Sequence, residues 1–421
     1  MNKLIEKTKT ILDDQKYQTI LMAVFVLVTF LGLFLSQSSV VAFLLMLSSL
    51  FLLYLTKIPV KAKWFVAGLI LIVLLPFAAS QGDTYESFMD VATMVGIYVC
   101  MALGLNIVVG MAGLLDLGFV AFFAIGAYTY AIFATPQANN FLHFMDFPLS
   151  GNTFWLFILI GGFVAALFGV LLGIPVLRVK GDYLAIVTLG FGEIIRIVFN
   201  NMDKPINITN GAMGISSITP PTIFGIELVN PSQFYYVILV AIVFVLFVIK
   251  KLEISKIGRS WRAVRENEIA AQAMGINLFK TKLSAFAVGA LFSGMMGVIF
   301  ASKQTFIDPT SFTMLESITV LVMVVLGGMG SVPGVILGAA VVTILNLQVL
   351  TEVSNWLTQL SMEGVVSIPD VLSPAKMQRF IFGLLLITFA LYKPKGLIQE
   401  KNRHVDPKIF EEAGENAHAS N

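Results

Sequence analysis

Long apolar segments alternate with short polar connections over most of the chain. A membrane-spanning helix needs about 17–25 predominantly apolar residues, and most of these segments reach that length. The pattern therefore predicts a series of transmembrane helices. Nine segments are predicted as spans: residues 19–35, 40–55, 64–79, 91–109, 118–133, 154–176, 183–199, 234–249 and 283–301.

Residues 317–351 form a further apolar stretch that is too long for one crossing. Its 35 uncharged residues would extend about 52 Å as a straight helix, whereas the hydrocarbon core is about 30 Å thick. The sequence GGMGSVPG at 327–334 offers glycines and a proline that release the backbone from helix. We therefore expect two legs, of which the first, residues 317–326, enters the membrane as a broken or re-entrant element.

A short final apolar segment, residues 380–392, completes the predicted fold. Basic residues at its ends can reach the membrane interfaces. The fold class is an all-α polytopic membrane protein with about 10–12 transmembrane legs, including broken or re-entrant helices. We predict an accessory three-span region over residues 1–80, a core domain over 88–395 and a polar tail over 396–421.

Positive charge predicts the orientation of these helices. If the N-terminus is cytoplasmic, 22 of the 27 Lys and Arg residues fall in inner segments, as the positive-inside rule requires. Counting 317–351 as one crossing would place the basic residues of the tail outside, so the same rule favours the folded-back arrangement. We expect both termini in the cytoplasm. The first span lacks a small-residue cleavage site and is expected to be retained.

Composition excludes several function classes. Hydrophobic residues make up 57% of the chain and charged residues 12%, with a mean hydropathy of +0.88, whereas soluble domains are about 25% charged. Cys100 and three scattered histidines do not form a disulfide, zinc or haem pattern. Motifs of metalloproteases, serine hydrolases and phosphate-binding loops are absent. We expect neither an enzyme nor a cofactor, metal or nucleic-acid site.

A polar, basic insert of 33 residues, 250–282, interrupts the apolar pattern. Apolar positions recur within it at helical spacing: Ile257, Trp261, Val264, Ala271 and Met274. Charged positions point elsewhere around the same helix: Arg259, Arg262, Arg265 and Glu266. We predict one amphipathic helix whose apolar edge presses into a cytoplasmic partner.

The alternative for this insert is a basic helix lying on the lipid surface. Such helices carry a broader apolar face flanked by bases. The insert instead contains small residues that permit close backbone contact with a protein: Ala270, Ala271, Ala273 and Gly275. Docking to a protein partner is therefore favoured.

Glycines interrupt two of the apolar stretches. One break carries Gly110, Gly113 and Asp116, and the other carries Gly327, Gly328, Gly330 and Gly334. Asp116 either caps the following helix within a tight turn or has a role in transport. The sequence leaves both alternatives open.

Glu193 and Arg196 are charged residues within a predicted span, one helical turn apart, and can pair at i, i+3. A charge at mid-bilayer costs roughly 2.5–3.5 kcal/mol, so both are expected to face protein or water and to line the bundle interior. They either lock this helix to its neighbours or take part in gating. The outer loop 200–233 contains TNGAMGI at 209–215; it either receives a soluble partner or is a solvated connector.

Four passages together resemble the LivM family, the permeases of high-affinity branched-chain amino acid ABC importers. They are GLNIVVGMAGLLDLGFVAFFAIGAY at 104–128, LRVKGDYLAIVTLGFGEIIRIVFNN at 177–201, LVMVVLGGMGSVPGVILGAAVV at 321–342 and the insert continuing into the next span. EIAAQAMG at 268–275 resembles the EAA loop by which importer membrane subunits grip their ATPase subunits. The resemblance covers nearly the whole chain, and the three N-terminal spans resemble LivM rather than LivH.

This resemblance implies a permease subunit in the bacterial inner membrane that forms a path for leucine, isoleucine and valine. It implies a LivH-type second permease, two separate ATPase subunits of the LivG and LivF type, and a periplasmic binding protein. The implied ATPase-coupling residues are Trp261, Arg262, Arg265, Glu268, Ala270, Ala271 and Gly275. Ile269 separates Glu268 from the alanines, which departs from the Glu-Ala-Ala pattern.

Two other functions remain open. Related permeases carry urea, short amides or sugars. An ion-coupled secondary transporter would use midplane charges such as Glu193 and Arg196 without an ATPase. The sequence identifies no substrate-binding residues.

Overall fold

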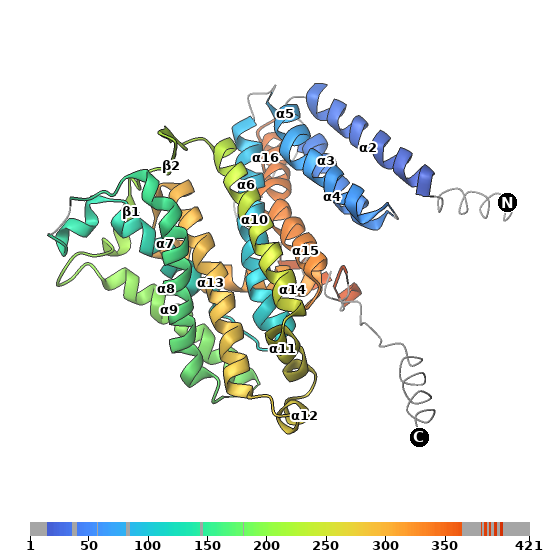
Figure 1. Ribbon diagram of the computed structural model, residues 1–421. Helices are drawn as coiled ribbons and strands as arrows, with labels where there is room; N and C mark the ends of the chain where they lie inside the picture. Colours follow the sequence, from blue (N-terminus) through green and yellow to red (C-terminus); the bar gives the residue numbers. More distant parts are fainter. Residues whose placement is uncertain are drawn as a thin grey trace, which may run out of the picture.

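A computed structural model of the protein describes residues 15–35, 40–56, 58–80, 85–143, 146–179 and 181–363, and single positions or short runs between 380 and 398. These residues form a bundle of long helices (Figure 1). Eight helical stretches in the described part are long and apolar enough to cross a membrane, and two shorter apolar helices, Val40–Tyr54 and Val120–Phe133, accompany them. The predicted fold class, an all-α polytopic membrane protein, is confirmed.

The helices follow in order: α2 (Gln15–Leu35), α3 (Val40–Leu55), α4 (Val60–Leu69), α5 (Leu75–Ala79), α6 (Tyr85–Asn106), α7 (Phe119–Phe133), α8 (Phe154–Val176), α9 (Asp182–Asn201), α10 (Pro231–Ile254), α11 (Lys256–Glu266), α12 (Glu268–Ala273), α13 (Leu278–Gln304), α14 (Met314–Gly327), α15 (Val332–Ile344) and α16 (Leu350–Met362). Single π-helical turns join α4 to α5, η1 (Ile70–Leu74), and α15 to α16, η7 (Leu345–Val349), and a third, η2 (Ile107–Met111), extends α6.

Glycines bring the central helices α7, α8 and α13 into close contact. A Cβ atom added to Gly126 would lie 2.0 Å from the carbonyl oxygen of Gly294, and one added to Gly297 would lie 2.1 Å from that of Phe123. Within lipid, helices associate through such close backbone packing because the surrounding acyl chains are as apolar as the side chains. These contacts make α13 the centre of the bundle.

The N-terminal helices form a second apolar cluster. Buried side chains of α2 to α5 pack with the first turns of α6 and with Tyr235 of α10, apart from the main core. Figure 1 shows α2, α3, α4 and α5 along one side of the bundle. The three-part division predicted from the sequence remains a prediction.

The folded-back arrangement of residues 317–351 is confirmed. Helix α14 has 14 residues and therefore extends only about 21 Å. The chain reverses at Gly328 and Gly330, whose φ angles are 113° and 85°, a region that favours glycine. Ser331 then caps α15 by accepting a hydrogen bond from the Gly334 amide at 3.2 Å.

The second leg is longer than predicted. Helix α15 continues through η7 into α16 as far as Met362. The expected end at Thr351 was wrong because the following residues, with Glu352 and Gln359 among them, are polar but compatible with helix.

Two small antiparallel sheets lie toward the end of the bundle opposite α11 and α12 (Figure 1). Strand β1 (Ile215–Ser216) pairs with β4 (Phe306–Ile307), and β2 (Thr222–Ile223) pairs with β3 (Ile226–Glu227). The first pair ties the loop after α9 to the end of α13. This region contains the predicted outer loop.

Some predictions fall outside the described residues. They include the basic residues before residue 15, six of the thirteen positions of the 380–392 span and the tail beyond residue 398. A short described run after that span returns to the glycine break: the Leu397 amide donates to the Leu326 carbonyl at 2.8 Å and the Ile398 amide to the Gly327 carbonyl at 3.1 Å.

Candidate functional site

The polar insert folds as two short helices rather than one. Asn267 ends α11 with φ −161° and ψ 110°, and its Oδ1 accepts hydrogen bonds from the Ile269 and Ala270 amides, both at 3.0 Å. An asparagine that caps the next helix in this way interrupts the previous one. The prediction of one continuous amphipathic helix was therefore wrong. Helices α11 and α12 form a hairpin at one end of the bundle (Figure 1).

Part of the predicted apolar edge faces the protein itself. Trp261 is fully buried, and its Nε1 donates to Ser284 Oγ at 2.9 Å and to the Thr281 carbonyl at 3.1 Å. Val264 and Ala271 are also buried. The expectation that these three side chains press into a partner was wrong, because amphipathic spacing does not tell which body an apolar edge contacts. They anchor the hairpin to the start of α13.

The outer surface of the hairpin is small and apolar. Ile269 and Met274 are 82% and 83% exposed. We call the following exposed residues the α12 tip: Ile269, Ala270, Ala273, Met274 and Gly275. Exposed apolar surfaces are common where a protein contacts another protein or a membrane, and docking of the insert to a protein partner remains a prediction.

Gly275 has a backbone role at the end of α12. Its φ is 84°, its amide donates to the Gln272 carbonyl, and the Ile276 amide donates to the Ala271 carbonyl, both at 3.0 Å. This is the left-handed glycine cap of a Schellman motif. Glu268, at the other end of α12, forms an ion pair with the buried Lys282 of α13. The tip is thus held at both ends.

The arginines of α11 bind main-chain carbonyls. Arg262 Nη2 donates to the Glu253 carbonyl at 2.7 Å, at the end of α10. Arg265 Nη1 donates to the Gly110 carbonyl, and its side chain lies against Gly113, where an added Cβ would be 3.1 Å from Arg265 Cγ. Helix α11 therefore rests directly on the first glycine break.

The two glycine breaks meet at this point. Asn106 Oδ1, from the end of α6, accepts a hydrogen bond from the Gly330 amide at 2.8 Å. A Cβ added to Gly110 would lie 2.0 Å from Asn106 Oδ1 and 2.5 Å from the Gly330 nitrogen. We call Asn106, Gly110, Arg265 and Gly330 the glycine junction. It connects α11 to α6 and to the hairpin of α14 and α15.

The other break glycines pack the second hairpin. Gly334 faces Gly327 so closely that an added Cβ would lie 2.4 Å from the Gly327 carbonyl oxygen. Gly328 contacts Gly396, where an added Cβ would lie 2.5 Å from Gly328 Cα. The sequence predicted both breaks but not their contact. Asn106 was missed, and its only signal was an amide side chain within an apolar run, four residues before Gly110.

Asp116 lies in the loop between η2 and α7 and is fully buried. Its Oδ1 accepts a hydrogen bond from the Gly118 amide at 2.9 Å, whereas Gly118, the N-cap of α7, has no side-chain cap. Thr188 of α9 supports the same turn by accepting from the Leu117 amide at 3.0 Å. The tight turn is confirmed and the helix cap is not. A role of Asp116 in transport remains a prediction.

Glu193 and Arg196 pair as predicted, with Arg196 Nε 2.8 Å from Glu193 Oε2. Their side chains are 34% and 31% exposed, and apolar residues of α9 such as Ile186 and Ile194 are exposed as well. The expectation that the pair lines the interior of the bundle was wrong for this chain alone. Helix α9 lies at the bundle surface and presents the pair there.

The predicted outer loop is held by its own side chains. The Asn210 amide donates to Asn207 Oδ1 at 2.8 Å, and Asn210, Gly211 and Gly214 all have positive φ angles. Met213 and Phe224 project from this side of the molecule and are largely exposed. The loop therefore forms a surface that is held by internal hydrogen bonds and carries exposed apolar side chains.

Sequence comparisons agree with this architecture. A family described as "Branched-chain amino acid transport system / permease component" matches residues 87–390. The high-affinity branched-chain amino acid transport system permease protein LivM of Escherichia coli K12 is 39% identical over 363 residues, 80% of this chain and 75% of that protein. LivM of Salmonella typhimurium is 38% identical over 382 residues, 85% and 80% of the two chains.

A more distant relative has another substrate in its name. The ribose import permease protein RbsC of Haemophilus influenzae is 26% identical over 297 residues, 68% of this chain and 84% of that protein. No solved structure matches the chain. The family match over most of the chain and the two LivM relatives lead to one conclusion: this protein belongs to the permease family of branched-chain amino acid transport systems.

Proposed function

We propose that the protein is the LivM-type permease subunit of an ATP-driven importer that moves leucine, isoleucine and valine into the cell. The observation that carries the proposal is the α12 tip, an exposed apolar surface anchored on the buried Trp261 and linked through Arg265 to two broken membrane helices. A permease that couples to a separate motor needs such a surface.

The α12 tip is the proposed contact for a cytoplasmic ATPase subunit. Ile269 and Met274 supply apolar side chains for a pocket of the partner, and Ala270 and Ala273 allow its backbone to approach. Interface affinity concentrates in a few well-buried apolar anchors surrounded by contacts that exclude water. The hairpin and both chain termini are placed in the cytoplasm on the positive-inside rule.

Movement of the ATPase subunits is proposed to reach the membrane through the glycine junction. Trp261 makes α11 and the start of α13 move together. Arg265 holds the Gly110 carbonyl, and Asn106 holds the Gly330 amide. A shift of α11 would therefore move α6 and the hairpin of α14 and α15 together. Such a joint movement allows a single contact to switch the helix bundle between two states.

The exposed side of α9 is the proposed contact for the LivH-type second permease and the edge of the substrate path. Glu193 and Arg196 are each about one-third exposed within a candidate span. Charges facing lipid at this depth would cost roughly 2.5–3.5 kcal/mol each, so protein or water must cover them. A second permease across a path satisfies this condition.

The outer loop surface is the proposed receiving site for a periplasmic binding protein. Met213, Phe224 and Ile226 are exposed apolar residues on that side. The binding protein would then mainly select among amino acids with aliphatic side chains. One methylene group changes the binding free energy in an apolar pocket by only about 1–3 kcal/mol, so a strong amino acid site in this chain is not required.

The test is uptake into proteoliposomes that contain the complex copurified with this chain. We expect ATP inside the vesicles, with binding protein and labelled leucine, isoleucine or valine outside, to give concentrative uptake. An ion gradient without ATP should give none. ATP-driven uptake of a sugar, urea or a short amide in place of the three amino acids would overturn the substrate, and ATP-independent uptake by the purified chain alone would overturn the ATPase coupling.

Sugar transport is the second candidate because of the similarity to a ribose permease. That relative is less similar to this chain than the two LivM proteins. The same uptake assay with labelled ribose separates the two candidates.

A further inference from the structure

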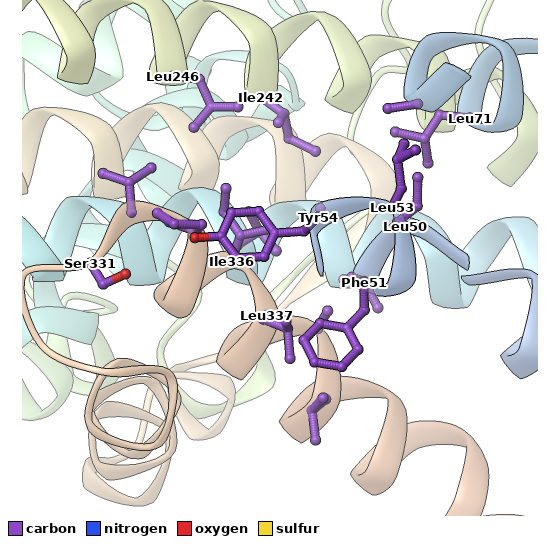
Figure 2. A pocket seen from close by; sticks show the side chains of 18 of the residues that line it. Leu50, Phe51, Leu53, Tyr54, Leu71, Ile242, Leu246, Ser331, Ile336 and Leu337 are labelled. Carbon is purple, nitrogen blue, oxygen red and sulfur yellow. The ribbon is translucent and has the colours of Figure 1, made fainter. Parts of the chain in front are cut away.

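A large open groove separates the N-terminal helices from the core. Its volume is about 1990 Å³, and its walls are formed by α3, α4, α6, α10 and α15. Figure 2 shows Phe51 and Tyr54 of α3 lying toward Ile336 and Leu337 of α15, and Ile242 of α10 on another wall. Pockets for small molecules are usually about 300–1,000 Å³. The groove is therefore large enough for a ligand with long apolar chains.

One end of the groove is basic. Two acidic residues, Glu253 and Glu266, are outnumbered there by five basic ones from three helices: Lys63, Lys250, Arg259, Arg262 and Arg265. This end coincides with α11, on the side placed in the cytoplasm. The groove thus combines an apolar body with a positively charged end.

Three of the basic side chains contact groups that carry no formal charge. Arg259 Nη1 donates to the Ile254 carbonyl and Arg262 Nη2 to the Glu253 carbonyl, both at 2.7 Å. Each bond uses one of five guanidinium donors, and a carbonyl carries no formal charge. Lys250 Nζ lies 4.5 Å from the centre of the Trp64 ring, a cation–π contact with an uncharged partner.

From this combination we propose that the groove binds an anionic phospholipid of the inner leaflet. The acyl chains fill the apolar body, and the phosphate headgroup contacts Lys63, Lys250, Arg259 and Arg262. The orientation of the lipid rests on the proposed function, which places α11 in the cytoplasm. Basic pockets between transmembrane helices on that side bind anionic headgroups, and tryptophans such as Trp64 are enriched at this depth.

An anionic lipid accounts for both parts of the groove in one molecule. A transmembrane helix of another protein would cover the apolar walls but would need its own acidic residues at the basic end. Among the described positions from 380 to 398, only Leu397 lines the groove. The headgroup would lie beside Arg262, less than one turn from Arg265 of the glycine junction. Bound lipid is therefore expected to steady α11 and to raise the rate of coupled transport.

The experiment is native mass spectrometry of the delipidated complex titrated with phosphatidylglycerol or phosphatidylcholine. The wild type should retain phosphatidylglycerol in preference to phosphatidylcholine. Because each base near an anionic surface contributes roughly fivefold, the double variant Lys250→Gln with Arg262→Gln should bind phosphatidylglycerol about 30-fold more weakly. Lys251→Gln is the matched control, since Lys251 is adjacent and exposed but does not line the groove.

Each outcome decides the proposal. Equal binding of the two lipids by the wild type would overturn it. A loss of phosphatidylglycerol binding in the Lys251→Gln control as large as that in the double variant would also overturn it. The proposal would also be overturned if the double variant bound lipid normally but associated more weakly with the other subunits. That result would mean that the second permease, and not a lipid, fills the groove. ATP-driven leucine uptake by the wild type in either lipid tests the proposed function separately, because it can succeed when the lipid preference fails.

Discussion

Replacement of Gly110 by alanine is expected to reduce ATP-driven leucine uptake at least tenfold. The added Cβ would lie 2.0 Å from Asn106 Oδ1 and 2.5 Å from the Gly330 nitrogen. Asn106 would have to rotate away and lose its bond to the Gly330 amide, and a buried donor left unpaired costs about 1–3 kcal/mol. The two broken helices would separate at the point where α11 contacts them. The atoms nearest to the added Cβ belong to Asn106 and Gly330 and not to the α12 tip, so the ATPase subunits should still copurify.

The matched control is Gly32→Ala. Gly32 lies within α2, away from the proposed contacts, and an added Cβ would meet only Ala42 Cβ at 3.9 Å, an ordinary contact, so uptake should stay near the wild-type level. Asn106→Leu is a second variant that keeps the side-chain size but removes the acceptor for Gly330. If the complex carrying Asn106→Leu assembles and transports normally, the glycine junction is not part of the coupling path.

Substitution of Ile269 and Met274 by aspartate is expected to abolish copurification of the ATPase subunits. Burial of each apolar side chain contributes about 1.5–3 kcal/mol, so loss of both weakens the contact by two orders of magnitude or more. The fold should be unaffected because both side chains are more than four-fifths exposed. The measurement is pull-down of the ATPase subunits together with the thermal stability of the permease.

Phe224→Asp is the control for an exposed apolar residue elsewhere. Phe224 is fully exposed on the strand side of the molecule, and its φ of 50° is a conformation that aspartate tolerates. ATPase association should be unchanged in this variant. Retention of the ATPase subunits by the Ile269→Asp, Met274→Asp chain would disprove the assignment of the α12 tip.

The sequence predicts the membrane helices well because their signal is local. Length alone requires residues 317–351 to fold back, and the glycines of 327–334 give the place. The i, i+3 spacing of Glu193 and Arg196 likewise predicts their ion pair. These features depend on helix geometry and bilayer thickness, which are the same in every membrane protein.

The candidate site was harder to predict because it depends on tertiary contacts. Periodicity marks Trp261 as apolar but does not tell whether it faces α13 or a partner. Asn267 is compatible with a helix interior and with a cap, and only packing of α12 decides between them. Nothing local brings Asn106 to Gly330, 224 residues away. The i, i+3 spacing of Glu193 and Arg196 does not tell how far α9 is covered by the other helices, so it could not predict their exposure.

Cysteine accessibility at position 274 tests the central claim that the α12 tip is a cytoplasmic contact for the ATPase subunits. Cys100 is the only cysteine of the chain and is buried, so Met274→Cys introduces a single reactive thiol. A membrane-impermeant maleimide should label it in inside-out vesicles and not in right-side-out vesicles, and bound ATPase subunits should protect it. Labelling in right-side-out vesicles, or equal labelling with and without the ATPase subunits, would contradict the account.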